Sequence, residues 1–365
     1  MLPLYGGIPL YADMWSGYEP NDRSANNAFH DQAAWEERFQ RLERLRLNGL
    51  VLTHPHPYVL FVDYRDKYPE AAWLKPDELA AKRQMLRWLI DAGRRHGISL
   101  YFLTWNVWLP RGFASARGIN QDGVDTPLTR EFTRWTVGEF FREYSGFGGL
   151  VTMAAETPPG CSDFVREGIV EGMKLATPRP RLILWNWCSY PEQIRQVLAA
   201  YDGESQVMDY LQYEQFFSRR ADPRIGMFSR DLGGRPMTAL GGPKSANAYL
   251  LFAHPGFARD VVSDFWSHGH GRGLVIEEVH QRDRWLAEAA FARYAWNPRE
   301  PYRAEVWESL LVERYGSATL AKPLLAALEH ASLIIPTQLK LTHSQTDHFM
   351  PQAGMLLAQM LAMPS

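Results

Sequence analysis

The fold is decided by the stretch Gly148-Gly-Leu-Val-Thr-Met-Ala-Ala-Glu156, which Thr157-Pro-Pro-Gly160 follows at once. A short apolar run that ends at a turn rich in proline and glycine indicates a buried β-strand. Here the strand ends in a carboxylate. In a (β/α)8 barrel, the C-terminal ends of the strands carry the catalytic residues. The stretch therefore predicts a catalytic glutamate at Glu156 if the rest of the chain builds such a barrel.

Strand-like and helix-like segments alternate along the whole chain. The expected strands are residues 7–13, 50–53, 98–105, 149–155, 181–187, 206–213, 236–240 and 273–278. The expected helices among them are residues 31–46, 76–96, 129–144, 162–175, 191–200, 256–267 and 282–296, while residues 215–235 are poorly patterned. This order predicts an α/β fold, a (β/α)8 TIM barrel over residues 1–298. Helices are also expected at residues 304–315, 320–333 and 354–363, so we predict that residues 299–365 form a C-terminal α-helical extension packed on the barrel.

Composition and charge exclude several classes of protein. The formal net charge of the 365 residues is −2, so we expect no long-range electrostatic attraction to nucleic acid or to an anionic membrane. No apolar run is long enough to span a bilayer. Cys161 and Cys188 are the only cysteines, and no Cys/His spacing is typical of a zinc site. We expect no cofactor and no bound metal.

The N-terminus carries no basic segment followed by an apolar one, so no signal peptide is visible and the cytoplasm is the expected location. The first expected strand begins close to Met1, which leads us to expect a missing upstream segment. With such a segment, a periplasmic or secreted location becomes the alternative. For the oligomeric state, a homodimer is an open alternative.

The ends of the expected strands collect aromatic, amide and charged side chains at one mouth. Aromatic faces stack on sugar rings, amide, imidazole and indole groups bind hydroxyls, and a cation suits the carboxylate of an acidic sugar. The alternative for the aromatic content of 13% is an ordinary buried core. The candidate substrate-binding residues are Tyr11, Asp13, His54, Trp105, Asn106, Arg111, Trp185, Asn186, Trp187, Tyr213 and Lys244.

Carboxylates at the same strand ends indicate glycoside hydrolysis. That reaction uses one carboxylic acid to protonate the leaving oxygen and a second carboxylate as base or nucleophile. We expect Glu156 to be the acid. The second catalytic carboxylate is expected to be Glu214 or Glu278, with Asp209 and Glu277 ranked behind them.

These residues also have structural alternatives. Glu156 is placed to cap the turn that follows it. Glu214 has Arg219 and Arg220 within ion-pairing reach in sequence, and Asp209 is suited to local pairing.

Two further functions stay open. A carbohydrate-binding barrel without turnover would carry the same aromatic and amide residues. A metal-dependent amidohydrolase would use His54 and His56, which lie two residues apart at the end of an expected strand.

Short segments of the chain resemble a known family. Phe291-Ala-Arg-Tyr-Ala-Trp-Asn-Pro298, then Glu305-Val-Trp-Glu308 and Tyr315-Gly316, is similar to the helix after the last barrel strand in the α-glucuronidases of glycoside hydrolase families 67 and 115. Leu182-Ile-Leu-Trp-Asn-Trp-Cys-Ser-Tyr190 resembles their fifth strand, and Val151-Thr-Met-Ala-Ala-Glu156 their acid-bearing strand. Related tails occur more distantly in the β-N-acetylhexosaminidases of families 20 and 84.

The resemblance implies an inverting glycoside hydrolase that acts on an α-linked uronic acid in a plant or algal polysaccharide or oligosaccharide. It implies Glu156 as the acid and, by position on the sixth strand, Glu214 as its partner. The expected seventh strand lacks the further glutamate of those families, and Asn186 stands where they carry an arginine.

Overall fold

The structure, a computed structural model, divides into two compact units. It describes residues 4–9 (backbone only), 29–53, 56–104, 108–122, 124–153, 162–186, 189–211, 218–241, 253–268, 271–276 and 285–334. The first unit comprises Leu4–Asp209 with Asp231–Met237, and the second comprises Met1–Pro3, Tyr210–Arg230 and Thr238–Ser365. Among the helices in the described ranges, none is long and apolar enough to cross a membrane.

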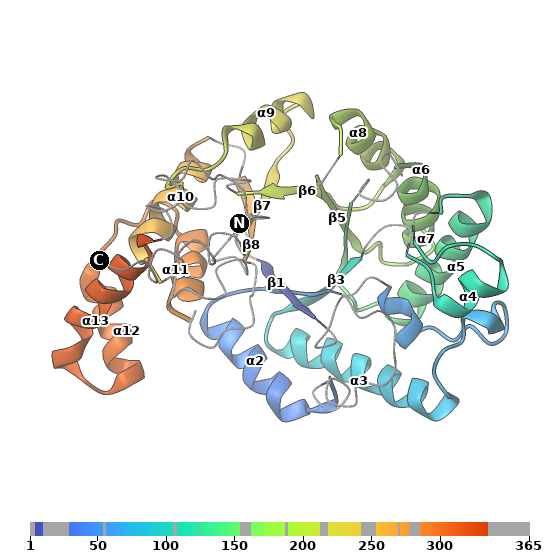
Figure 1. The fold of residues 1–365 in the computed structure, drawn as a ribbon, viewed down its shortest axis with the longest axis horizontal. Coiled ribbons are helices and arrows are strands. Elements are labelled where there is room, and N and C mark those ends of the chain that lie inside the picture. Colours follow the sequence, from blue (N-terminus) through green and yellow to red (C-terminus); the bar gives the residue numbers. More distant parts are fainter. Residues whose placement is uncertain are drawn as a thin grey trace, which may run out of the picture. The chain divides into compact units, whose positions relative to one another are not determined.

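The first unit is built on a parallel sheet whose strands lie side by side in chain order. In Figure 1 these strands follow a curve, with helices along its outer side. The strands are β1 (Leu4–Pro9), β2 (Gly49–Thr53), β3 (Ser99–Thr104), β4 (Gly149–Met153), β5 (Arg181–Trp185) and β6 (Ser205–Tyr210). Tyr210, at the end of β6, is counted with the second unit.

Helices connect these strands. They are α2 (Gln32–Arg44), α3 (Pro76–Arg95), α4 (Arg111–Ala116), α5 (Pro127–Glu143), α6 (Ser162–Phe164), α7 (Glu171–Met173) and α8 (Pro191–Ala200). Two 3-10 turns, η1 (Pro57–Leu60) and η2 (Pro69–Ala71), follow β2, and a π-helical segment, η3 (Val165–Val170), joins α6 to α7.

Local sequence explains where these helices begin and end. Asp31 caps α2, because its carboxylate accepts a hydrogen bond from the amide of Ala34 at 3.0 Å. Gly97 follows α3 with a φ of +68°, the left-handed conformation that glycine adopts without steric cost. These signals confirm the helices expected at residues 31–46 and 76–96.

The core of the first unit includes a layer of aromatic side chains between the sheet and the helices. Phe102 of β3 stacks on Phe61 at 5.8 Å between ring centroids and meets Phe140 of α5 at 5.2 Å. Phe147, just before β4, lies 4.6 Å from the same ring. All four rings are buried, so this part of the aromatic content belongs to the core.

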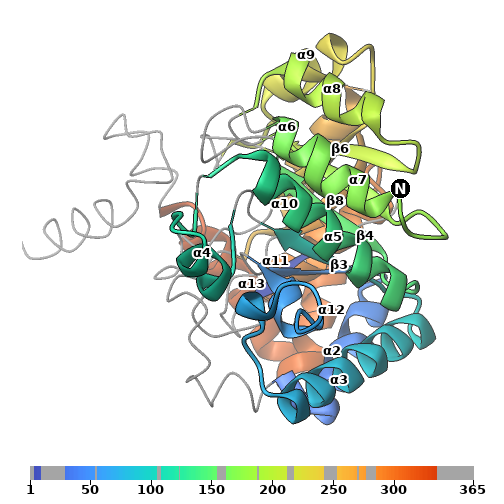
Figure 2. The ribbon, with the colours of Figure 1, turned by 90° about the vertical axis from the view of Figure 1, so that its right-hand side faces the viewer.

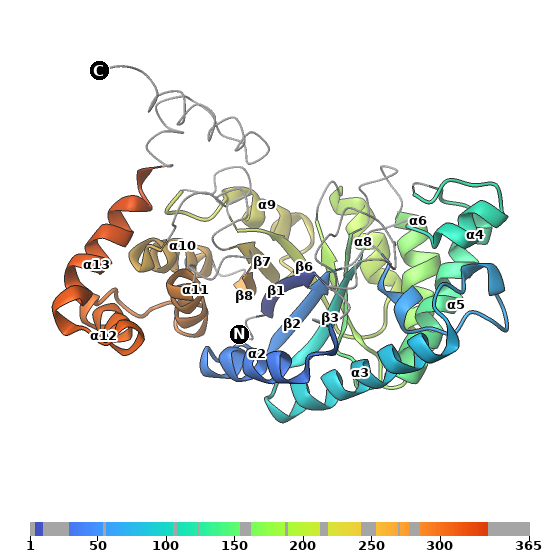
Figure 3. The same ribbon diagram turned by 60° about the horizontal axis from the view of Figure 1, so that its bottom comes forward.

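The described part of the second unit contains β7 (Met237–Gly241), apart from its first residue, together with β8 (Gly271–Ile276) and several helices. The helices are α9 (Pro223–Asp231), α10 (Pro255–Ser267), α11 (Trp285–Trp296), α12 (Ala304–Tyr315) and α13 (Ala318–Ala331). Figure 3 shows α12 and α13 beside α10 and α11. Buried Trp307 of α12 packs on Tyr294 of α11 at 5.9 Å, and the Ser332 hydroxyl accepts a hydrogen bond from the Ala253 amide at 2.8 Å.

The α/β class and the parallel strands separated by helices are confirmed, and the curved sheet is consistent with a TIM-like barrel. Helices are present in the expected extension at residues 304–315 and 318–331. The division into domains at residue 298 stays a prediction. The helix expected at residues 354–363 lies outside the described residues.

Candidate functional site

The C-terminal ends of β5 and β6 carry three of the residues singled out from the sequence. The Asn186 amide donates to the Met208 carbonyl at 2.7 Å, which extends the ladder one residue beyond Trp185. The Asn186 side-chain amide donates to the Asp209 carboxylate at 3.1 Å. Trp185 and Asp209 are both buried. Asp209 therefore forms a local hydrogen bond, which is the structural alternative expected for it.

The ladder register shows which side of the sheet these residues face. Phe102 packs against α5, so its side of the sheet faces the helices. The register of β3, β4 and β5 places Leu182 of β5 on this same helix-facing side. Because side chains alternate along a strand, Asn186 lies on the same side as Leu182, and its partner Asp209 lies there too. Trp185 lies on the opposite side, which faces away from the helices. Of these three residues, Trp185 is the one placed toward the inner side of the sheet.

Arg111 is the exposed first residue of α4, in the long connection from β3 to α5. This connection is fixed in place: its ends meet at a bridge between Trp108 and Asp122. Phe113 of α4 is fully buried and stacks on Phe132 of α5 at 4.1 Å. Arg111 is therefore an exposed cation on a well-packed segment. Its binding to substrate stays a prediction.

The segment of α4 also rests on the connection that follows β2. Arg117 pairs with Glu70 of η2 at 2.6 Å, and the Phe113 ring meets Tyr68 edge-on at 5.7 Å. A side chain at Gly112 would place its Cβ 2.1 Å from the Glu70 carbonyl oxygen, so this close approach requires glycine. Two long loops after neighbouring strands thus form one rigid block.

His56 belongs to the aromatic core. Its ring lies edge-on to Tyr58 at 5.2 Å and stacks on Phe132 of α5 at 6.2 Å, and it is 4% exposed. Burial lowers the pKa of His56 to about 3, so the imidazole is neutral at physiological pH. The amidohydrolase hypothesis needs His56 as a metal ligand beside His54, whereas the structure packs the His56 ring among core aromatic side chains. Within the described residues, no group of three His, Cys, Asp or Glu side chains is placed to hold a metal ion.

The remaining candidates lie outside the described residues and stay predictions. They are Tyr11, Asp13, His54, Trp105, Asn106, Glu156, Trp187, Tyr213, Glu214, Lys244, Glu277 and Glu278.

Arg219, which the sequence offered as an ion-pair partner for Glu214, contacts α10 and its cap; an ion pair with Glu214, which lies outside the described residues, stays a prediction. Its guanidinium pairs with Asp260 of α10 at 2.7 Å and lies 2.9 Å from Nε2 of His254. His254 also caps α10, and burial followed by the charge of Arg219 lowers the pKa of His254 to about 4. Arg219 thus has two established partners within the second unit.

Tyr190 is a further candidate, which does not stand out in the sequence. It caps α8 on the connection after β5, and its side chain is 73% exposed. Its backbone amide donates to the Gln193 side chain at 2.9 Å, so the residue is anchored while the ring stays open to solvent. The signal in the sequence was its place just before Pro191, the first residue of the helix after an expected strand.

Comparison with known proteins shows a fold found among glycoside hydrolases. No protein-family model and no curated protein matches the chain. A GH138 enzyme targeting pectin rhamnogalacturonan II has a similar structure, with a TM-score of 0.80 and 20% identity over 93% of this chain and 44% of that chain. The chain thus spans less than half of that enzyme's length.

Two further structures are similar at lower scores. A family 89 glycoside hydrolase from Clostridium perfringens, in complex with PUGNAc, gives a TM-score of 0.56 and 13% identity over 86% of this chain and 39% of that chain. A Thermobaculum terrenum O-GlcNAc hydrolase gives 0.52 and 14% over 86% of this chain and 63% of that chain. Identities this low show the fold alone. The resemblance to families 67 and 115 stays a prediction.

Proposed function

We propose that the chain is the catalytic barrel of a glycoside hydrolase. The observation that carries the proposal is the similarity of 93% of this chain to the GH138 enzyme at a TM-score of 0.80. The family 89 enzyme and the O-GlcNAc hydrolase support the same class, since both match over 86% of this chain.

We further infer that β1 to β8 close into a (β/α)8 barrel. In that arrangement, the residues after each strand meet at one mouth. Glu156 follows β4, Glu214 follows β6 and Glu278 follows β8, so all three carboxylates come from strand ends of the required polarity. Trp185, on the inner side of β5, then contributes an apolar surface below them.

The proposed mechanism uses two of these carboxylates. Glu156 donates a proton to the glycosidic oxygen as the bond to the anomeric carbon breaks. Glu214 or Glu278 either removes a proton from the attacking water or attacks the anomeric carbon itself. A separation of about 5–5.5 Å between the two carboxyl groups favours retention, and about 6.5–9.5 Å favours inversion.

For the substrate, we propose a plant polysaccharide fragment that carries a uronic acid. The GH138 enzyme targets pectin rhamnogalacturonan II, and the sequence of this chain independently suggested an acidic sugar. Of the two cations among the candidate substrate-binding residues, the structure describes Arg111, which is suited to bind the sugar carboxylate. Lys244 is the second candidate.

The experiment measures sugar release by glutamine variants of the candidate carboxylates. Wild type, Glu156→Gln, Glu214→Gln and Glu278→Gln are incubated with oligosaccharides from rhamnogalacturonan II, with Glu277→Gln as the matched control. Neighbouring residues on a strand face opposite sides, so Glu277 and Glu278 separate an inward carboxylate from an outward one.

The variant that lacks the acid, and the variant that lacks its partner carboxylate, are each expected to have a kcat lower by about 100- to 10,000-fold. NMR of the first sugar released gives the anomeric outcome. Wild-type rates in both Glu214→Gln and Glu278→Gln would show that the second catalytic carboxylate is a different residue.

A further inference from the structure

Helix α5 and the helix that follows β4 approach each other closely in the first unit (Figure 2). A Cβ added at Gly168 would lie 3.3 Å from Cβ of Thr133 in α5. At Gly172 it would lie 2.7 Å from the Arg134 carbonyl oxygen and 2.8 Å from the Val137 side chain. The two helices therefore touch along their backbones, and their spacing leaves little freedom.

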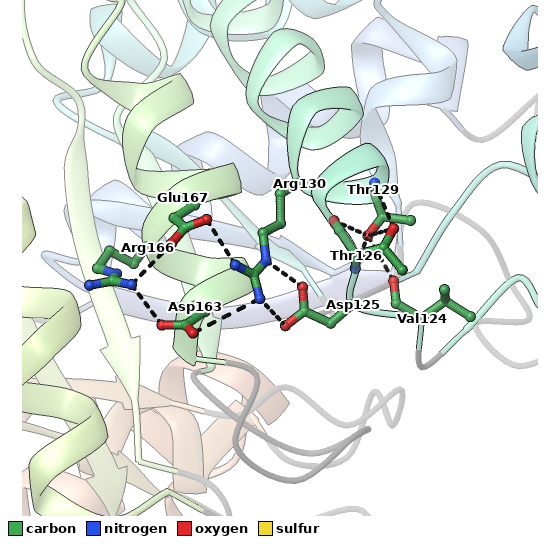
Figure 4. Close-up of polar contacts among 8 residues, drawn as sticks. All are labelled: Val124, Asp125, Thr126, Thr129, Arg130, Asp163, Arg166 and Glu167. Carbon is green, nitrogen blue, oxygen red and sulfur yellow. Dashed lines mark hydrogen bonds and ion pairs between the residues drawn. The ribbon is translucent and has the colours of Figure 1, made fainter.

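Arg130 joins the beginnings of these two helices, as Figure 4 shows. Its guanidinium forms a two-point contact with Asp125, with distances of 2.6 and 3.0 Å. On its other side it donates to Glu167 at 2.8 Å and lies 3.9 Å from Asp163. Hydrogen bonds to Asp125 and then Glu167 raise the pKa of Arg130 above its ordinary value, so it stays charged.

The α5 side of this junction is rigid. The Thr126 hydroxyl accepts from the Thr129 amide at 3.3 Å, and the Thr129 hydroxyl accepts from the Thr126 amide at 2.9 Å. The Thr129 hydroxyl also donates to the Val124 carbonyl at 2.8 Å. Arg130 therefore extends from a fixed turn, and the carboxylates that it binds on the other helix take their position from that turn.

The other side of the junction contains a rare backbone feature. Glu167 lies in the π-helical segment η3, and π-helical turns are found frequently at functional sites. Arg166, in the same segment, pairs with Asp163 at 2.8 Å and with Glu167 at 3.0 Å. Among the described residues, the ion pairs of Arg166 are with these two carboxylates of its own helix, whereas Arg130 joins that helix to α5.

We propose that Arg130 is a positioning residue for the acid step, acting through the helix that begins at Ser162. This inference rests on the proposed function, in which Glu156 is the acid. Residues 154–161, which include Glu156, connect the end of β4 to the start of α6, so the place of α6 sets one end of that connection. Arg130 fixes this helix to α5 through Asp163 of α6 and Glu167 of η3.

The kinetic test compares Arg130→Met, Arg130→Lys and the matched control Arg166→Gln. Two substrates are used: an oligosaccharide from rhamnogalacturonan II, and the 2,4-dinitrophenyl glycoside of the sugar that it releases. Departure of a sugar alcohol needs the acid, whereas dinitrophenolate leaves without a proton. A defect in acid positioning therefore appears with the first substrate and not with the second.

Arg130→Met should lower kcat on the oligosaccharide by roughly 10- to 100-fold with little change in KM. Its kcat/KM on the dinitrophenyl glycoside, which covers only the steps up to departure of dinitrophenolate, should stay near that of the wild type whether the enzyme retains or inverts. Arg130→Lys should recover part of the loss, and Arg166→Gln should behave as the wild type. Equal losses on both substrates, or a loss in Arg166→Gln as large as in Arg130→Met, would overturn the inference.

Hydrogen exchange separates this inference from the proposed function. Amide exchange in a peptide covering residues 154–164 should be faster in Arg130→Met than in the wild type and unchanged in Arg166→Gln. If the wild type releases no sugar, the proposed function fails, and unchanged exchange in Arg130→Met would then overturn the anchoring role as well.

Discussion

His96 is a residue whose charge state couples folding to pH. Its two ring nitrogens lie 2.7 Å from Glu43 and 2.7 Å from Glu36, both on α2, while the ring itself stacks on Phe39 at 6.0 Å. The hydrogen bonds with Glu43 and then Glu36 raise the pKa of His96. Only the imidazolium donates to both carboxylates at once, so protonation fastens α2 to the end of α3.

We predict that His96→Gln destabilises the protein more at pH 6 than at pH 9. A folded-state pKa above the unfolded value gives stability that is complete below about pH 6.5 and is lost as pH rises through the folded pKa. The measurement is the free energy of unfolding in urea at both pH values. In a Glu36→Gln/Glu43→Gln background, the effect of His96→Gln should no longer depend on pH. An equal loss at pH 6 and pH 9 in the wild-type background would contradict the prediction.

Tyr190 allows a prediction about substrate contact at the residue scale. Within the proposed function, its exposed ring is an outer platform for a sugar of a longer oligosaccharide. Loss of one aromatic contact of about 0.5–1.5 kcal/mol corresponds to a roughly two- to twelvefold change in affinity. Tyr190→Ala should therefore raise KM for oligosaccharides in that range with kcat retained. Tyr190→Phe keeps the ring and should match the wild type; a KM unchanged in Tyr190→Ala would remove the residue from the site.

At the scale of elements, α4 is held by its tertiary contacts rather than by its own sequence. It is a short helix whose buried residues are Phe113 and Ala114. The Phe113 ring lies between Phe132 and Tyr68. A helix this short is unstable alone, so its packing determines whether it forms.

We predict that Phe113→Ala lowers the free energy of unfolding by about 3–5 kcal/mol, because it leaves a cavity under α4. Arg117→Ala, at the C-cap of the same helix, removes a partly exposed ion pair with Glu70 and a cation over the Phe113 ring, and should cost about 1 kcal/mol or a little more. Denaturant unfolding of the two variants tests the contrast. Similar losses in both would show that the helix is held by its charge rather than by its ring.

The elements that the sequence predicted well are those with strong local signals. The helix expected at residues 191–200 begins at Pro191, and the helix expected at 304–315 ends at Tyr315 before Gly316, which adopts a positive φ. The sequence did not predict α4 or α9. The first depends on contacts with distant rings, and the second lies in a region with little helical periodicity. The π-helical geometry of η3 has no local sequence signal of its own.

The types of residue at the candidate site were predictable from the sequence, but the partners of each residue were not. Trp185, Asn186 and Asp209 lie at strand ends as expected. Which side of the sheet each one faces depends on register, which the sequence did not determine. The roles of His56 and Arg219 depended on neighbours distant in sequence, Phe132 for the first and Asp260 for the second. Glu156 and its partner stay predictions that rest on position along the chain.

For the whole molecule, we propose that the chain hydrolyses a glycosidic bond with Glu156 as the acid. The most direct test of this claim is to incubate the wild type and Glu156→Gln with rhamnogalacturonan II oligosaccharides and glucuronic-acid-substituted xylo-oligosaccharides. Mass spectrometry identifies any sugar released. We predict that the wild type releases a uronic acid from one of them and that Glu156→Gln releases at least about 100-fold less. Undiminished release by Glu156→Gln, or tight binding of an oligosaccharide without any product from the wild type, would contradict the claim.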